Sequence, residues 1–179
     1  MPKVTDAYRA EKKRLILACT GEILKEKPLY RVTMRDIIRR AGFSQGVIYR
    51  YYASLDAIYI DYMNVHTTGF PLEERIDALL CTYLAEREVL TECFSLLGEY
   101  IEGLMQSIVG EMFFELIVLY TYDAEKRTAV FPKLQFKQSL AYAQRKMMEY
   151  TLKAVEKGVF RPQIPVRSIL LFARSFIDG

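Results

Sequence analysis

A short break between two helical segments is the feature that most restricts how this chain can fold. Residues 34–41 carry apolar side chains at helical spacing, and Gly42 follows them. Glycine readily adopts the left-handed backbone conformation that ends helices, so it predicts the end of this segment. Ser44 is a favoured N-cap and predicts another short helix, residues 45–51. Two short helices joined by Ala41-Gly42-Phe43-Ser44 indicate a helix-turn-helix.

Capping signals frame this pair of helices on its N-terminal side. Thr33 and Asp36 have the spacing of a capping box and predict the start of the helix that ends at Gly42. An earlier helix is predicted from a cap at Thr5 to about Lys25. Pro28 ends it because proline cannot continue the helical hydrogen-bond ladder.

Helical periodicity continues along the rest of the chain, and alternating strand patterns are nearly absent. Ser54 predicts the cap of a fourth helix from Leu55 to about Thr68, and Gly69-Phe70-Pro71 interrupts the pattern after it. Further helices are predicted at residues 72–86, 88–105, 107–123 and 126–157, and from about Val166. The sequence therefore predicts an all-α fold, with a small head at residues 1–55 and a larger helical body at 56–179.

Charge is distributed unevenly between these two parts. Residues 1–55 contain 12 Lys/Arg and 5 Asp/Glu, whereas residues 56–179 contain 13 Lys/Arg and 17 Asp/Glu. A basic head on a mildly acidic body suggests a polyanionic partner for the head. A solvated basic face without a partner agrees with the charge equally well.

Several classes of function find no support in the sequence. The single histidine, His66, cannot be placed beside a nucleophile, and there is neither a glycine-rich phosphate loop nor a metal-ligand cluster. Glu111 and Glu115 lie one helical turn apart and are interpreted as a solvated face. We therefore expect no enzyme, no cofactor and no bound metal.

Cellular location is predicted from equally simple features. The three cysteines lack metal-ligand spacing and fit small apolar residues in a reducing cytosol, with a reactive redox thiol as the alternative. Apolar stretches are too short to span a bilayer, and no secretory signal is visible. A cytoplasmic protein without a membrane partner is expected.

Three segments together closely resemble one known family. Arg14–Ala18, Val32–Ile37 and Ala41–Tyr52 are similar to the corresponding segments of the TetR family of bacterial transcriptional regulators. The resemblance covers about residues 12–60. The remainder matches only in the number and length of its helices.

The resemblance implies both a function and a division of the chain. Residues 1–55 would form a three-helix helix-turn-helix DNA-binding domain, and residues 56–179 a larger helical ligand-binding and dimerisation domain. The expected function is a transcriptional repressor that acts as a homodimer on double-stranded operator DNA. A small apolar or aromatic effector, not identified by the sequence, would release it. An activator, or a constitutive DNA-binding protein without a ligand, remains the alternative.

The family's DNA contacts can be carried over to matching positions. Gln45 is the best candidate to read a base, because an amide side chain can bond adenine N6 and N7 together. Tyr49 would contact the backbone or a thymine methyl group. Val47 and Tyr51 fit a packing role equally well. The full set of expected DNA contacts is Thr33, Arg35, Ser44, Gln45, Gly46, Val47, Tyr49, Arg50 and Tyr51.

One position departs from the family pattern. The family usually has a phosphate-binding lysine at the start of the fourth helix, where this chain has Leu55 followed by Asp56. The loss of one phosphate contact lowers the salt dependence of DNA binding. Basic residues near the N-terminus are expected to compensate, namely Lys3, Arg9, Lys12 and Lys13.

The body is rich in aromatic residues and methionine, which line apolar cavities but equally fill an ordinary core. The expected ligand residues are Tyr62, His66, Tyr100, Met105, Phe113, Phe114, Ile117 and Tyr120. The expected dimer residues, by resemblance, are Tyr142, Phe172 and Phe176. The family normally continues its last helix, so part of the dimer surface is expected beyond Gly179.

Overall fold

The computed structural model describes residues 6–67, 69–169 and 171, and these form helices, turns and loops without a strand. The predicted all-α fold is confirmed. Among the described residues, none of the helices combines the length and apolar character that crossing a lipid bilayer requires. The predicted cap Thr5 lies outside the described residues, as do Phe172 and Phe176.

The chain divides into two compact units that are not contiguous in sequence. Unit 1 contains residues 1–68 and 105–134, and unit 2 contains residues 69–104 and 135–179. A segment from the middle of the predicted body therefore packs with the N-terminal helices. The functional boundary at residues 55/56 stays a prediction, and the two compact units are described separately below.

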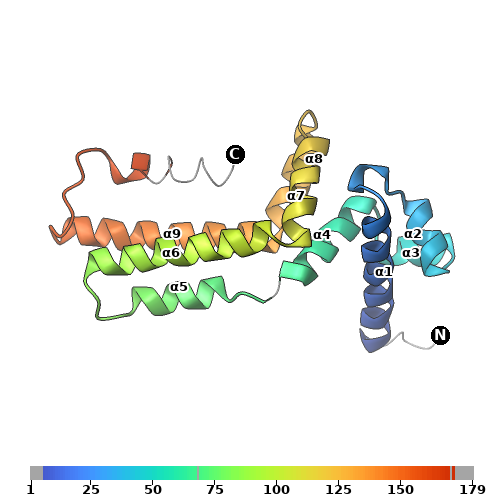
Figure 1. The fold of residues 1–179 in the computed structure, drawn as a ribbon, viewed down its shortest axis with the longest axis horizontal. Helices are drawn as coiled ribbons and strands as arrows, with labels where there is room; N and C mark the ends of the chain where they lie inside the picture. Colours follow the sequence, from blue (N-terminus) through green and yellow to red (C-terminus); the bar gives the residue numbers. More distant parts are fainter. Residues whose placement is uncertain (1–5, 68, 170, 172–179) are drawn as a thin grey trace. The chain divides into compact units, whose positions relative to one another are not determined.

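Unit 1 is built around α1, which contacts both α2 and α4 (Figure 1). Its elements are α1 (Asp6–Glu26), η1 (Leu29–Arg31), α2 (Met34–Ala41), α3 (Gln45–Tyr51), α4 (Leu55–Thr67), α7 (Ile108–Leu119), α8 (Ala124–Val130) and η2 (Phe131–Lys133). Helix α7 contacts both α4 and η1. Ile16, Ile37, Ile48, Ile58 and Met63 are fully buried in its core.

Local sequence explains where these helices begin and end. Thr33 and Asp36 form the predicted capping box, in which each side chain bonds the other residue's backbone N–H. Gly42 has a φ of 65°, which is the left-handed conformation that ends α2. Ser54 Oγ accepts a hydrogen bond from the Ala57 N–H at the start of α4. Ser44 occupies the N-cap position of α3 but its side chain makes no capping bond, contrary to the prediction.

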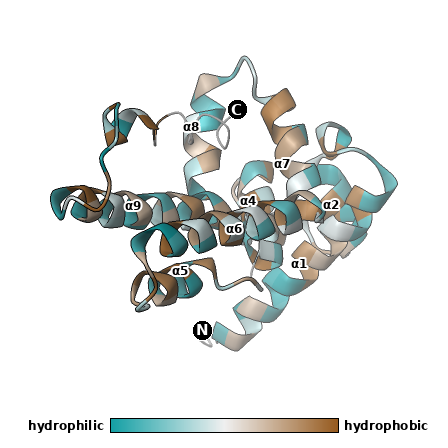
Figure 2. Ribbon diagram, turned by 60° about the vertical axis from the view of Figure 1, so that its left-hand side comes forward, coloured by the Kyte–Doolittle hydropathy of each residue, from teal (hydrophilic) through white to brown (hydrophobic). Residues whose placement is uncertain are grey.

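Unit 2 contains α5 (Leu72–Leu80), α6 (Glu86–Met105) and α9 (Gln135–Glu156). Helix α5 packs on α9, where the Tyr142 hydroxyl donates to Asp77 over 2.6 Å. Helices α6 and α9 run side by side in two views (Figures 1 and 2). Residues 166–169 are helical, as predicted from Val166.

The prediction of a single helix over residues 126–157 was wrong. The chain instead forms α8, the short η2 turn and α9. Pro132 lies in η2 and has no N–H to donate, so an α-helix cannot pass through this position without losing a hydrogen bond. The helical periodicity on both sides concealed this interruption.

A glycine in α1 sets how closely α4 approaches it. Gly21 is buried, and a Cβ atom built on it would lie 2.9 Å from the Tyr62 hydroxyl oxygen of α4 and 3.2 Å from a ring carbon. Gly98 in α6 provides a contrast, since a Cβ atom there meets no atom within 4 Å.

These two glycines give a matched test of the α1–α4 contact. Gly98→Ala should stabilise its helix by about 0.5–1 kcal/mol, because alanine loses less conformational entropy in a helix. Gly21→Ala should give no gain, or a loss of about 1 kcal/mol, because the Tyr62 ring must shift. Thermal unfolding measures both. An equal rise in melting temperature for the two variants would show that α4 does not depend on this contact.

Candidate nucleic-acid interface

Helix α3 and its two cap residues have one buried side and one exposed side. Ile48 and the C-cap residue Tyr52 are buried, at 0% and 3% exposure. The remaining residues present a polar surface in which Ser44, Gln45, Gly46, Tyr49 and Arg50 are exposed, and Val47 and Tyr51 are half-buried. Tyr49 is 44% exposed, so its ring and hydroxyl are accessible on this surface.

Helix α2 contributes a second edge to this surface. Arg35 is exposed and forms no ion pair with any described residue. Thr33 is also exposed, but its hydroxyl lies 2.6 Å from Asp36 Oδ2 and also accepts from the Asp36 N–H. The Thr33 hydroxyl is therefore already engaged in capping α2.

Asp36 is held by several donors at once. Lys27 lies 2.6 Å from its carboxylate, and Arg39 lies 2.9 Å from the other oxygen. The hydrogen bond from Lys27, followed by those from Thr33, holds the pKa of Asp36 well below its ordinary value. The ionised carboxylate thus joins the end of α1 to the start of α2.

A half-buried carboxylate positions the other end of the helix-turn-helix. Asp61 of α4 accepts a 2.6 Å hydrogen bond from the Tyr52 hydroxyl and a 2.9 Å bond from Lys13 Nζ of α1. Burial alone would raise the pKa of Asp61, but these two bonds and the Lys13 charge outweigh it and lower the pKa. Burial and the bond to Asp61 raise the pKa of Tyr52. One side chain therefore links α1, α4 and the residue that ends α3.

The first residues of α4 also make contacts with other helices of unit 1. Leu55 is half-buried, and Asp56 accepts hydrogen bonds of 2.5 Å from the Tyr120 hydroxyl and from Lys126 Nζ of α8. Burial and the bond to Asp56 raise the pKa of Tyr120. The position where a phosphate-binding lysine was expected thus lies beside an acid that holds α7 and α8.

The backbone of Leu29 in η1 is held by two side chains from other helices. Its N–H donates to Glu115 of α7 over 2.7 Å, and its carbonyl accepts from the Tyr59 hydroxyl of α4 over 3.1 Å. This turn directly precedes α2, so α4 and α7 both position the helix-turn-helix. Glu115 was interpreted as part of a solvated face with Glu111, which is wrong for Glu115.

Sequence reasoning missed Asp56, Asp61 and Glu115 as positioning residues. A weak signal was available for Asp61, because this acid follows the buried run Ile58–Tyr59 in a helix and needs a partner to lie near the core. The partners of Asp56 and Glu115 are 64 and 86 residues away in the sequence, so no local pattern identifies them.

The family comparison matches this same part of the chain. Residues 16–61, which run from α1 through most of α4, match the family model described as "Bacterial regulatory proteins, tetR family". The chain therefore contains a tetR-family helix-turn-helix domain. It is therefore a DNA-binding transcriptional regulator of the helix-turn-helix type and not an enzyme, as predicted.

Similarity to individual proteins extends beyond the helix-turn-helix. The uncharacterised HTH-type transcriptional regulator YfiR of Bacillus subtilis (strain 168) is 26% identical over 181 residues, covering 99% of this chain and 82% of YfiR.

Two solved structures share the fold. One is FadR of Thermus thermophilus, a TetR-family transcriptional repressor in complex with lauroyl-CoA, with 23% identity, a TM-score of 0.55, and coverage of 93% of this chain and 77% of FadR. The other is MexZ, a repressor of Pseudomonas aeruginosa, with 17% identity, a TM-score of 0.53, and coverage of 94% and 80%.

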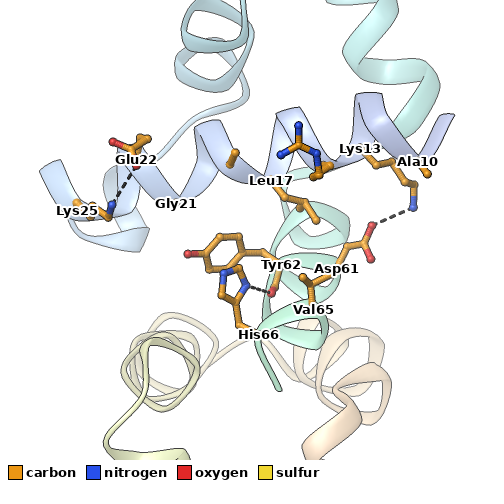
Figure 3. A pocket seen from close by; sticks show the side chains of 12 residues that line it. Ala10, Lys13, Leu17, Gly21, Glu22, Lys25, Asp61, Tyr62, Val65 and His66 are labelled. Atoms are coloured by element: carbon orange, nitrogen blue, oxygen red, sulfur yellow. Dashed lines mark hydrogen bonds and ion pairs between the residues drawn. The ribbon is translucent and has the colours of Figure 1, made fainter. Parts of the chain in front are cut away.

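Two expected ligand residues line a groove between α1 and α4 with a volume of about 670 Å³ (Figure 3). The rings of Tyr62 and His66 stack with centroids 4.1 Å apart, and His66 Nδ1 lies 2.8 Å from the Tyr62 carbonyl. The Lys13–Asp61 ion pair and the Glu22–Lys25 pair also line the groove.

The other expected ligand residues do not join this groove. Phe113 and Tyr120 pack on Phe131 within unit 1, with centroid distances of 5.4 and 6.3 Å. Tyr100 contacts Phe70 in unit 2, at 5.3 Å. Met105 and Ile117 are half-buried, and Phe114 is 56% exposed on α7, a helix rich in hydrophobic residues (Figure 2). The list therefore covers at least three separate places.

The remaining predicted features are less informative. Of the expected dimer residues, only Tyr142 is described, and its hydroxyl is used inside unit 2 by Asp77. Among the described residues, no cluster of three metal-ligating side chains is present. Cys93 is buried, which raises the pKa of its thiol to about 11, whereas Cys81 is exposed.

The Asp36 cluster generates a pH-dependent prediction. Because folding lowers the pKa of Asp36, its ionised form stabilises the fold above the unfolded value of about 4, and this contribution is lost as the pH falls below it. Asp36→Asn should cost about 1 kcal/mol at neutral pH, and the difference from wild type should shrink toward pH 3. Urea unfolding at several pH values measures it.

The control is Glu149→Gln, which changes an exposed acid in the interior of α9, away from both helix ends. It should leave the unfolding free energy unchanged across the same pH range. A difference between wild type and Asp36→Asn that stays constant with pH would contradict the charge-based account of this cap.

Proposed function

We propose that this chain represses transcription by binding double-stranded operator DNA through α2 and α3, and that a small apolar or aromatic effector releases it. The observation that carries the DNA half is the two-sided character of α3 inside the segment that matches the family. Ile48 and Tyr52 anchor the helix in the core, while Gln45 and Tyr49 are left on the surface.

Each exposed side chain has a distinct role in this proposal. Gln45 reads an adenine through its amide, and Gly46 lets the backbone approach the DNA closely. Tyr49 contacts the backbone or a thymine methyl group. Ser44 is available to DNA because its hydroxyl does not cap α3. The proposed contacts also include Thr33, Arg35, Val47, Arg50 and Tyr51, of which Val47 and Tyr51 are half-buried and contribute less.

Substitutions in α3 should weaken operator binding without unfolding the protein. Gln45→Ala should lower the affinity about tenfold or more, since a bidentate base contact is worth about 1–3 kcal/mol. Tyr49→Phe should lower it less. Competition binding on the DNA upstream of the chain's own gene measures both effects, with scrambled DNA as competitor.

Matched controls are available in unit 2. Tyr83→Phe and Gln163→Ala make the same chemical changes at exposed positions and should leave the affinity unaltered. Melting temperatures should be equal for all four variants. Unchanged affinity in both α3 variants would show that α3 is not the recognition helix. Equal wild-type affinity for upstream and scrambled DNA would exclude specific repression.

Effector control is supported by how α4 is connected. This helix carries Asp61 toward the helix-turn-helix, Asp56 toward α7 and α8, and Tyr62 with His66 on the groove. An effector that binds one arrangement of α4 more tightly therefore changes the fraction of molecules whose helix-turn-helix can bind DNA. The solved FadR relative holds lauroyl-CoA, which makes an apolar chain a reasonable class of effector for this fold.

In this proposal residues 1–55 contact DNA, and residues 56–179 respond to the effector and form a homodimer in the bacterial cytoplasm. A dimer presents two recognition helices to successive major grooves, about 34–36 Å apart. A change in that spacing lowers affinity without altering either recognition helix.

A ligand panel tests the effector half separately. With lauroyl-CoA, free fatty acids and polycyclic aromatic compounds as probes, at least one class should raise the melting temperature by several degrees. Saturating binding at about 100 times Kd adds about 2.7 kcal/mol of stability. The same compound should release the upstream DNA in a competition assay. The effector half is wrong if no class stabilises the protein, or if the stabilising compounds leave DNA affinity unchanged.

A further inference from the structure

Three consecutive cations in α1 have very different surroundings. Lys13 Nζ is paired with Asp61 at 2.9 Å and also lies over the Tyr52 ring. Arg14 forms two hydrogen bonds with Glu11, of 2.9 and 2.8 Å. Lys12 has no carboxylate of the described residues within ion-pair distance. Its charge is therefore not neutralised by the described part of the protein.

Aromatic rings hold the Lys12 ammonium in place. Its Nζ lies 4.4 Å from the centre of the Phe43 ring and 5.3 Å from that of Tyr8. A cation–π contact at an exposed site is worth about 0.5–1 kcal/mol, which restrains the side chain while leaving its full charge and its N–H donors available. Lys12 is half-buried, consistent with a stem packed on the protein and an ammonium group near solvent.

The location of Phe43 determines where the Lys12 ammonium is held. Phe43 belongs to the turn between α2 and α3 and directly precedes Ser44 and Gln45. The Lys12 ammonium is consequently held beside the first residues of the proposed recognition surface. A fixed positive charge at that edge is suited to a DNA phosphate, because phosphate contacts position the protein while base contacts specify the sequence.

We propose that Lys12 is a phosphate contact of α1, positioned by Phe43, and that Lys13 makes none because it holds Asp61. This inference rests on the proposed function of α3. It also accounts for the missing lysine at the start of α4, where Leu55 is half-buried and Asp56 is engaged by α7 and α8. The compensating charge comes from α1 instead.

The two neighbouring lysines provide the test. Each is replaced by methionine, which keeps most of the stem and removes the charge, and DNA affinity is measured over a range of salt concentrations. Lys12→Met should reduce the slope of log K against log salt by about one unit per half-site, with about a fivefold loss of affinity per half-site at about 0.15 M salt. Its melting temperature should stay near that of wild type.

Lys13→Met should show the opposite pattern. Its salt slope should match wild type, and its melting temperature should fall because Asp61 loses a charged partner. Lys12→Arg should recover the wild-type slope. A wild-type slope in Lys12→Met, or an equal loss of slope in Lys13→Met, would overturn the assignment.

The measurement separates this inference from the proposed function. Salt slopes are recorded on both the upstream DNA and scrambled DNA, since phosphate contacts do not depend on sequence. If wild type fails to prefer upstream DNA, the proposed repression fails while the Lys12 comparison can still be made on either duplex. If wild type prefers upstream DNA but Lys12→Met keeps its slope, only the present inference fails.

Discussion

The helix-turn-helix depends most on the two hydrogen bonds that the Asp61 carboxylate accepts. It accepts from Tyr52 at the end of α3 and from Lys13 of α1, while its own backbone belongs to α4. Short helices have few contacts of their own, and α3 has only seven residues. Its direction is therefore fixed by the residue that ends it. A partly buried carboxylate suits this role, since removal of either donor leaves a charge that is costly to bury.

A second set of long-range hydrogen bonds joins α7 and α8 to α4 and to the η1 turn before α2. Asp56 is bonded by Tyr120 and Lys126, and Glu115 accepts from the Leu29 N–H. These bonds contribute to the packing of residues 105–134 within unit 1. They also give α7 and α8 a direct connection to α4 and to the turn before α2. The proposed effector control depends on such connections, because an effector acts only through contacts that differ between two conformations.

The basic head has fewer free charges than its composition suggests. Lys13, Lys27 and Arg40 are paired with Asp61, Asp36 and Glu26, so they hold the head together. Net charge counts such cations equally with those that remain available to a polyanion. The surroundings of Lys12 show why the distinction matters, since aromatic contacts restrain a cation without neutralising it.

The sequence by itself determined the helical class, the ends of α2, and the start of α3 and α4, because caps and periodicity act over three or four residues. The segment around Gly42 and Gln45 also determined the family. Only the tertiary structure decided that the Ser44 side chain does not cap α3, that Pro132 divides a helix, and that Lys12 and Lys13 have different partners. The reason is physical. Caps depend on neighbours in the chain, whereas an ion pair such as Lys13–Asp61 joins residues 48 positions apart, and the sequence does not record which of several cations finds the carboxylate.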